Sequence, residues 1–342
     1  MLFIYSLTCA VIGGFFTSAL LTNIIVKSKL AKNTVNPLKD FLGAVGSHGS
    51  KQVTNLGGLA ICASTLITTS IFASLTHTPT IAIMATSFFF FCIGLWDDMS
   101  KIITKNSNGS KIRLRLFFTI AATLTFVIVL GKADIIDNSQ IVTPSFGHFK
   151  NITFLPVAIV VLFKIFTIVG SSNAVNITDG LDGMVSTSMV PTAMLFMVMP
   201  LLALSTNSYF DGTEVDADII NLSIYAGALL GSLLGFLWHN ASKATIFMGD
   251  SGSNFIGCTI GAMAVTMQAE IILAIAGIVF VIETLSTALQ IFTIRKFNKR
   301  IFKMAPLHHH FEIKGWTEHK IVARSFIVST LAMFVALMTI LK

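Results

Sequence analysis

The sequence predicts an all-α fold: one polytopic integral membrane domain over residues 1–342, with about ten transmembrane helices. Hydrophobic residues make up 54% of the chain and charged residues only 11%, and the mean hydropathy is +0.81. In soluble domains about a quarter of the residues are charged. The apolar residues also fall in runs of roughly 17 to 25, the length that a helix needs to cross the hydrocarbon core of a bilayer.

The expected helices follow one another along the whole chain. The first has no basic segment before it and no small-residue cleavage site after it, so we expect a retained helix and not a signal peptide. Only Gln268 and Glu270 separate the eighth and ninth runs, which leaves nine or eleven helices as alternatives. In order, the runs cover residues 2–26, 56–76, 80–96, 116–132, 154–172, 184–205, 219–239, 254–270, 271–294 and 322–341.

The basic residues predict the orientation of these helices. Loops after the odd-numbered runs hold 19 of the 23 lysines and arginines. Basic residues near helix ends are retained on the cytoplasmic side. We therefore expect these loops in the cytoplasm and both termini outside. The net charge of +7 then lies beside the bilayer, where it would attract anionic headgroups and phosphorylated substrates, and nucleic acid is not an expected partner. Topology alone is the alternative explanation for most individual lysines.

Five aspartates fall at or beside helix ends on this predicted cytoplasmic side. Asp97 and Asp98 lie in WDDMSK, where Lys101 follows at helical spacing and can neutralise one carboxylate. The others are Asp179 and Asp182 in NAVNITDGLDG and Asp250 in FMGDSGS. Carboxylates beside a phosphorylated substrate predict Mg²⁺, which binds through one or two carboxylates plus substrate phosphates. The alternative is that they are helix caps and turn residues.

Other polar residues stand out in apolar or basic surroundings. Three consecutive histidines lie in MAPLHHHFEIKGW, where imidazoles could hold phosphate oxygens, bind metal or move protons. Glu283 lies inside the ninth run, where a carboxylate is expected to face the bundle interior with a partner, and Lys164 is one candidate for that partner. The four cysteines lie in apolar runs without CxxC spacing, so neither zinc nor disulfides are expected.

Together these segments resemble the phospho-N-acetylmuramoyl-pentapeptide transferases, a family of the polyprenyl-phosphate N-acetylhexosamine-1-phosphate transferase superfamily. The resemblance covers about Ser47 to the C-terminus, and the HHHFEIKGW segment is its most specific part. It implies a ten-helix fold, a homodimer and a place in the bacterial cytoplasmic (inner) membrane. The implied reaction joins UDP-N-acetylmuramoyl-pentapeptide to undecaprenyl phosphate with Mg²⁺, giving lipid I and UMP. An oxygen of the lipid phosphate would attack the β-phosphorus, directly or after a phosphosugar forms on an aspartate.

The resemblance also implies roles for residues of this chain. Asp250 matches the magnesium ligand, and Asp97 and Asp98 match a pair that activates the lipid phosphate or supports the metal. With His309, these residues form the expected catalytic set. Phe247 is placed to stack on uracil. The expected substrate-binding residues are Lys51, Lys101, Arg113, Asn176, Asp179, Gly180, Leu181, Asp182, Asn240, Phe247, His308 and His310.

One segment departs from the family pattern. SHGSK is followed by QVTNLGG, which is one residue shorter than the usual stretch and lacks its proline, so the path of the chain after Lys51 is open. Three other functions remain as alternatives: another branch of the superfamily that makes an N-acetylglucosamine-1-phosphate lipid, a secondary transporter, and a catalytically silent scaffold. The histidine segment argues against the first. Carboxylates at one surface argue against the second, because transporter sites lie near the bilayer midplane.

Overall fold

The computed structural model of the chain describes residues 2–28, 53–104, 109–133, 135–136, 141–145, 148–152, 156–206 and 213–341. These residues form long helices and one antiparallel hairpin, in which Ile141 pairs with Ile152. The elements are α1 (Leu2–Lys27), α3 (Gly57–Phe72), α4 (Thr78–Thr104), α5 (Ile112–Lys132), β1 (Ile141–Ser145), β2 (His148–Ile152), α6 (Val157–Thr178), α7 (Met184–Thr206), α8 (Thr213–Asn240), α9 (Gly249–Thr266), α10 (Glu270–Ala276), α11 (Ile278–Phe297), α12 (Leu307–Ile313) and α13 (Glu318–Ile340).

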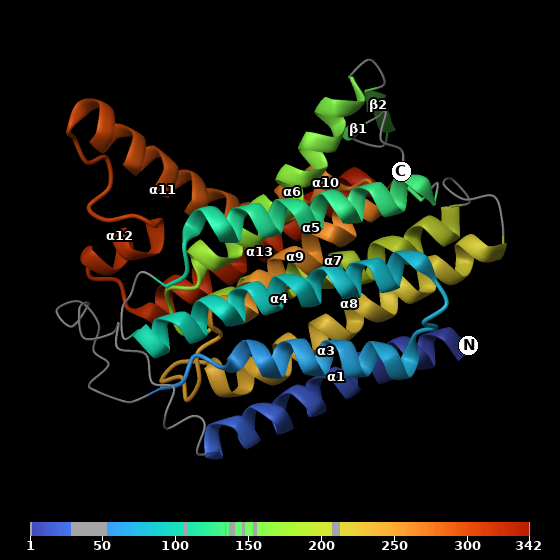
Figure 1. Cartoon of the computed structure of the whole chain (residues 1–342), viewed down its shortest axis with the longest axis horizontal. Helices are drawn as coiled ribbons and strands as arrows, with labels where there is room; N and C mark the ends of the chain where they lie inside the picture. Colours follow the sequence, from blue (N-terminus) through green and yellow to red (C-terminus); the bar gives the residue numbers. More distant parts are fainter. Residues whose placement is uncertain are drawn as a thin grey trace.

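The long helices run back and forth between two ends of the molecule, and both chain termini lie at the same end (Figure 1). Eight helices in the described part are long and apolar enough to cross a membrane: α1, α4, α5, α6, α7, α8, α11 and α13. The expected all-α, polytopic class is confirmed. Two further helices, α3 of 16 residues and α9 of 18 residues, lie alongside these eight, and the count of about ten crossings stays a prediction.

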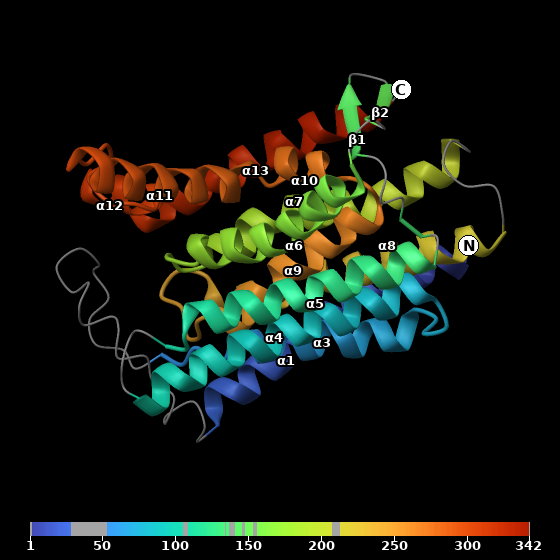
Figure 2. The ribbon, with the colours of Figure 1, turned by 45° about the horizontal axis from the view of Figure 1, so that its top comes forward.

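The structure changes three details of the expected pattern. The eighth expected helix begins earlier, at Gly249, so that Asp250 lies in its first turn. The ninth is broken at Gly277 into α10 and α11, and α11 leans away from the bundle (Figure 1). The histidine segment forms the short helix α12, which lies with α11 and one end of α13 to one side of the remaining helices (Figure 2).

Helix α9 is the centre of the bundle. Its residues from Ser251 to Thr266 are all buried, and it packs against α3, α4 and α6. Glycines permit this packing, because a Cβ at Gly257 would lie 2.5 Å from the Cα of Ser172 in α6. Small residues let membrane helices approach closely where the hydrophobic effect between helices is absent. The first turn of α9 is therefore fixed by its neighbours.

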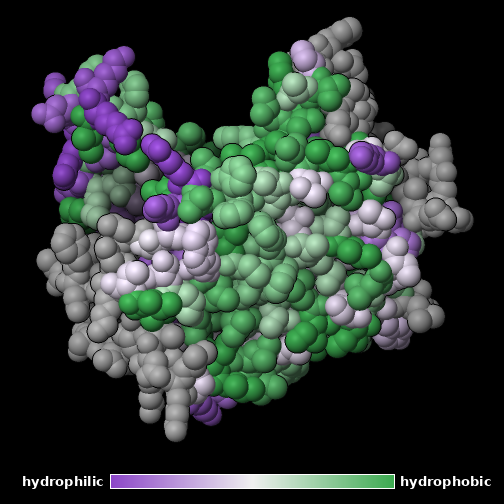
Figure 3. Space-filling view, in the orientation of Figure 1, coloured by the Kyte–Doolittle hydropathy of each residue, from purple (hydrophilic) through white to green (hydrophobic). Residues whose placement is uncertain are grey.

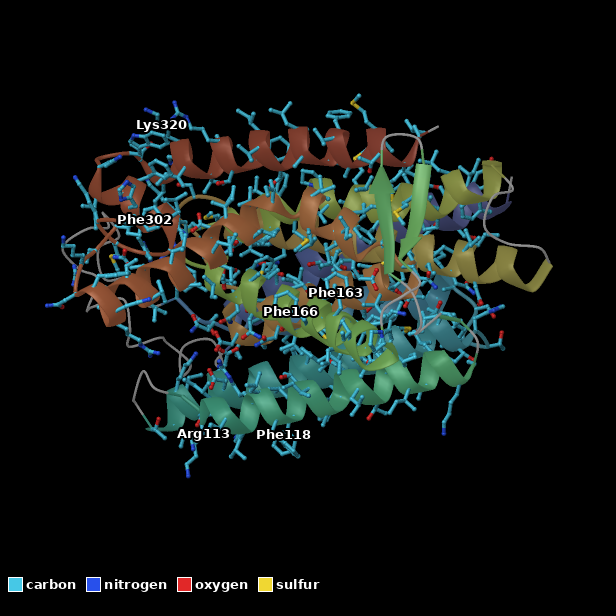
Figure 4. The ribbon with its side chains drawn as sticks, turned by 90° about the horizontal axis from the view of Figure 1, so that it is seen from above. Arg113, Phe118, Phe163, Phe166, Phe302 and Lys320 are labelled. Carbon is cyan, nitrogen blue, oxygen red and sulfur yellow. The ribbon has the colours of Figure 1, made fainter. Side chains whose placement is uncertain are left out.

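The surface of the molecule divides by polarity. Apolar side chains cover the face over α4 and α5, whereas hydrophilic ones gather over α11 and α12 (Figure 3). Viewed from above, Arg113, Phe302 and Lys320 lie at one end of the bundle, and Phe163 and Phe166 lie on α6 between the ends (Figure 4). The basic loops that the sequence predicts to share a face therefore do share one end, as far as they are described.

Candidate active site

Asp98 anchors the beginning of the central helix. Its carboxylate, near the end of α4, accepts hydrogen bonds from the backbone N–H of Asp250 (3.0 Å) and of Ser251 (2.9 Å). The first N–H groups of a helix have no intrahelical partner, and a carboxylate that accepts from them also meets the positive end of the helix dipole. Asp98 is 2% exposed, so it holds α9 in place and is not free for a ligand.

Asp97 and Asp250 converge on two cations. Lys101 Nζ lies 2.7 Å from Asp97 Oδ2 and 2.7 Å from Asp250 Oδ2. Arg115 Nη1 lies 2.9 Å and 3.3 Å from the same two oxygens. Ser110 adds a backbone N–H to Asp97 Oδ1 at 2.7 Å. The Asp97 side chain is 1% exposed but that of Asp250 is 18% exposed, so Asp250 is the carboxylate of this cluster that a ligand can reach.

Asn176, in the last turns of α6, completes the surroundings of Asp250. Its Nδ2 donates to Asp250 Oδ1 and to Ser253 Oγ, both at 2.9 Å. Glycines bring the backbones close enough for these contacts. A Cβ at Gly94 in α4 would lie 2.3 Å from the Asp250 carbonyl oxygen, and Gly249 has a φ of +72°, which glycine adopts without strain. Three helices, α4, α6 and α9, therefore build one polar site.

Asp182 and Asn240 hold the loop between α8 and α9. Asp182 Oδ2 accepts from the backbone N–H of Ala244 at 3.0 Å. Asn240 accepts from the Gly183 N–H and donates to the carbonyl oxygen of Ile246, at 3.1 Å and 2.8 Å. Both residues are buried. Phe247, half-buried at the end of this loop, is fixed through its backbone, which pairs with Thr54 and Gly57.

Each of the three histidines has its own partner. His308 Nδ1 lies 3.2 Å from Glu283 Oε2. His309 Nδ1 is hydrogen-bonded to Glu312. His310 Nδ1 accepts from the backbone N–H of Lys303 at 3.0 Å. The pKa of His310 is lowered from its ordinary value by partial burial and by the nearby charges of Lys314 and Lys303.

Helix α12, which carries the three histidines, contacts the TDGLDG turn at the end of α6. A Cβ on Gly180, within TDGLDG, would lie only 2.2 Å from His308 Nε2, so the missing side chain lets the His308 ring pack against the Gly180 backbone. Through Asn176 the same end of α6 reaches Asp250. The structure thus brings Asp97, Asp98, Lys101, Asn176, Asp250, Gly180 and His308 into one continuous region.

Other expected residues lie elsewhere or serve packing. Arg113 is exposed on α5 and points away from the bundle (Figure 4). Leu181 packs in an apolar cluster with Met184, Val279 and Ile321. Asp179 ends α6 beside Gly180 and is half-buried. Lys51 lies outside the described residues. Glu283, for which the sequence suggested Lys164 as a partner, contacts His308.

Arg115 is the main site residue that the sequence interpretation missed. It lies two residues after Arg113, so the two side chains leave α5 on different sides. A signal was present: Thr119 and Thr123 follow Arg115 at intervals of four, and both are buried. Polar residues at that spacing mark the face of the helix toward the bundle. Ser110, in the linker before α5, offers no comparable signal.

The carboxylates fit a magnesium ion in their donor chemistry. Asp97 Oδ2 and Asp250 Oδ2 converge on one point, now the Lys101 ammonium, and Mg²⁺ needs only one or two protein carboxylates when substrate phosphates supply the rest. Among the described residues, no group of three or more His, Cys, Asp or Glu side chains is arranged to hold a metal alone. A metal here would depend on oxygens from the substrate.

Comparison with known proteins shows which family this chain belongs to. The profile of glycosyl transferase family 4 matches residues 80–268, which include both α4 aspartates, Asn176 and Asp250. The phospho-N-acetylmuramoyl-pentapeptide-transferase of Pelagibacter ubique (strain HTCC1062) is 33% identical over 338 residues, covering 96% of this chain and 90% of that protein. The protein of the same name from Leptospira biflexa serovar Patoc (strain Patoc 1 / Ames) is 35% identical over 312 residues, covering 86% and 82%. The chain therefore belongs to glycosyl transferase family 4, among the phospho-N-acetylmuramoyl-pentapeptide transferases.

Proposed function

We propose that this membrane enzyme transfers phospho-N-acetylmuramoyl-pentapeptide from its UDP-activated form to undecaprenyl phosphate, giving lipid I and UMP. This reaction is the first membrane step of peptidoglycan synthesis. The relatives' names support the sugar-phosphate donor. The observation that carries the proposal is the convergence of two carboxylates, Lys101 and Arg115 beside the TDGLDG turn and the histidine helix. The active site would face the cytoplasm of the bacterial inner membrane, and the enzyme would act as a homodimer.

In this reaction a bond forms between an oxygen of the lipid phosphate and the β-phosphorus of the donor. The bond from that phosphorus to the bridging oxygen breaks, and UMP leaves with its electron pair. Such transfers depend on positioning and on neutralising charge more than on a strong base. Lys101 and Arg115 already lie together at 2.7 Å and 3.3 Å from Asp250, and we propose that both cations turn to phosphate oxygens when substrates bind.

Mg²⁺ is proposed as the cofactor, with Asp250 as its ligand and Asp97 in support of the metal site, because Asp97 shares the Lys101 and Arg115 cations with Asp250. When bound, the ion would neutralise the diphosphate and so stabilise the departing UMP. Asn176 would keep Asp250 oriented through its hydrogen bond to Oδ1. Asp98 would act indirectly, by holding the α9 N-terminus on which Asp250 is carried.

The test is a reaction with purified protein, Mg²⁺ and undecaprenyl phosphate, given either UDP-N-acetylmuramoyl-pentapeptide or UDP-N-acetylglucosamine. We expect UMP release and a lipid-linked sugar only with the first donor, and none after chelation of the metal. Release with the second donor alone would move the protein to another branch of the superfamily. Release with neither would favour the silent scaffold.

A secondary transporter is the remaining alternative from another class. Transporter sites lie near the bilayer midplane at interrupted helices. Here Asp97 and Asp98 lie in the last turns of α4, and Asp250 lies in the first turn of α9. This position at one end of the helices favours an enzyme that meets a soluble substrate at the membrane surface.

A further inference from the structure

Glu283 is a buried carboxylate that the proposed reaction does not yet use. It lies in α11, is 5% exposed and is separated by 25 residues from its partner, His308. One oxygen, Oε2, lies 3.2 Å from both the backbone N and the ring Nδ1 of His308. The backbone N–H can only donate, so this oxygen is an acceptor. An ionised carboxylate has only acceptor oxygens, so with Glu283 ionised the ring Nδ1 of His308 carries the proton and donates it to this oxygen.

The opposite ring nitrogen has no partner. His308 is 1% exposed, and among the described residues nothing hydrogen-bonds to its Nε2. Buried polar atoms in folded proteins are hydrogen-bonded with few exceptions, and an exception calls for an explanation such as a ligand. With Nδ1 protonated, a neutral ring offers a lone pair at Nε2. That lone pair accepts from O–H or N–H groups and does not bind a bare phosphate oxygen.

The surroundings of Nε2 point to the place where a ligand would meet it. This nitrogen lies against Gly180, where a Cβ would come within 2.2 Å, and Gly180 is exposed on its other side. The exposed Gly180 of the TDGLDG turn therefore lies next to Nε2, at the end of α6 that also carries Asn176.

We propose that Glu283 is a positioning residue, which holds His308 with Nδ1 protonated so that Nε2 accepts a hydrogen bond from an O–H or N–H of the nucleotide sugar at the TDGLDG turn. The identity of that ligand rests on the proposed function. The protonation pattern of the ring does not, because it is set within the protein. Glu283 acts through His308 and touches no reacting atom.

A double-mutant cycle tests the dependence on His308. Transfer by Glu283→Ala, His308→Ala and the double variant would be measured against the concentration of UDP-N-acetylmuramoyl-pentapeptide. We expect about a tenfold loss in kcat/KM for Glu283→Ala, and a double variant no worse than His308→Ala, because one contact is being removed twice. Losses that multiply, or full activity of Glu283→Ala, would overturn the proposal.

Ser286→Ala is the matched control. Ser286 lies one turn along α11, and its Oγ donates to the carbonyl oxygen of Glu283 at 2.7 Å, so the helix loses a buried hydrogen bond while the carboxylate remains. We expect its kcat/KM to stay within about twofold. If Glu283→Ala does not fold, Glu283→Gln replaces it, since the amide oxygen still accepts from Nδ1 and we expect a milder loss. A Ser286→Ala loss equal to that of the Glu283 variants would assign the effect to packing and overturn the proposal.

Nitrogen-15 spectra of histidine-labelled protein give a readout that needs no turnover. The His308 signals are assigned by their absence in His308→Ala. We expect a protonated Nδ1 in the wild type, its loss in Glu283→Ala, and a shift of the Nε2 signal when UDP-N-acetylmuramoyl-pentapeptide is added. A protonated Nε2 without substrate overturns the role of Glu283, and an unmoved Nε2 signal overturns the substrate contact. If the wild type transfers nothing, the proposed function fails while the ring assignment is still decided by the substrate-free spectrum.

Discussion

At the scale of single residues, Asp250 is the carboxylate on which the proposed chemistry depends most. We expect Asp250→Asn to lower lipid I formation about a hundredfold or more, because asparagine keeps the shape but loses the charge that attracts Mg²⁺ and faces Lys101 and Arg115. The measurement is UMP release at ordinary magnesium, with thermal unfolding to establish that the variant is folded. An asparagine caps a helix nearly as well as an aspartate. Near-normal UMP release would therefore identify Asp250 as a cap and not a metal ligand.

Arg115 and Arg113 form a matched pair on one helix. We expect Arg115→Ala to lower transfer about tenfold or more, because its guanidinium contacts both Asp97 and Asp250. Arg113 is exposed on the other side of α5, so the loss from Arg113→Ala should be clearly smaller. Kinetics of the two variants, side by side, measure the difference. Equal losses would mean that the basic charge of this segment matters and not the contact.

His310 makes the stability of the folded protein depend on pH. Its pKa is lowered in the folded chain, so the folded protein binds fewer protons at this ring than the unfolded chain does. The stability that this ring contributes is therefore full above its ordinary pKa of about 6.5 and is lost as the pH falls through the lowered value. Protonation would also remove the acceptor for the Lys303 N–H.

We accordingly expect the wild type to lose more thermal stability than His310→Asn between about pH 7.5 and pH 5. Melting curves in the same detergent at each pH make the comparison. Asparagine can accept the same backbone hydrogen bond but does not titrate. Parallel losses in the two proteins would show that other groups control the acid sensitivity.

Residue types and spacing could predict much of this site, but not how each residue is used. WDDMSK predicts that Lys101 neutralises a carboxylate, and it does. That Asp98 caps α9 depends on contact between segments 152 residues apart, which no local pattern contains. The same holds for Asp182, which accepts from the Ala244 N–H 62 residues away, and for Asn240, which accepts from the Gly183 N–H 57 residues away.

At the scale of elements, α1 and α8 are joined through glycine. Gly227, Gly231 and Gly235 recur every four residues on α8, and a Cβ at Gly231 would lie 2.0 Å from the carbonyl oxygen of Val11. We expect Gly231→Val to destabilise the protein by about 1–3 kcal/mol, since the helices must separate to admit the side chain. Thermal unfolding measures the change.

Gly170→Ala is the control for that substitution. It also places a side chain on a glycine inside a membrane helix, α6, but its Cβ would meet only the Phe166 ring at 3.9 Å. We expect its melting temperature to stay close to that of the wild type. If both variants melt alike, the α1–α8 contact is not closely packed in the membrane.

The elements themselves show where sequence patterns stop being informative. Hydropathy predicts the apolar runs because nearly every residue of a crossing is apolar. It did not predict the break at Gly277, the histidine helix or the β1–β2 hairpin. Each of these is short, and each is defined by backbone turns and not by an apolar stretch.

At the scale of the whole molecule, the orientation in the membrane can be tested directly. In a background without Cys9 and Cys92, which are exposed, we expect Asn298→Cys to react with an impermeant thiol reagent only from the cytoplasm. Thr76→Cys, in the connection between α3 and α4, should react only from outside. The reason is that the segment between α11 and α12, where hydrophilic side chains gather (Figure 3), carries Lys299, Arg300 and Lys303. Labelling of Asn298→Cys from outside would reverse the proposed orientation.

The polar character of α9 has a consequence for how the protein is made. This helix carries four glycines along with Asp250, Ser251, Ser253 and Asn254, and it is not among the eight apolar helices of the described chain. A segment of this composition enters lipid poorly when it leaves the translocon alone. Its partners α3, α4 and α6 all precede it in the chain. We therefore expect α9 to insert between helices that are already in the bilayer, so that the carboxylate cluster forms only after Asp250 has been added to the chain.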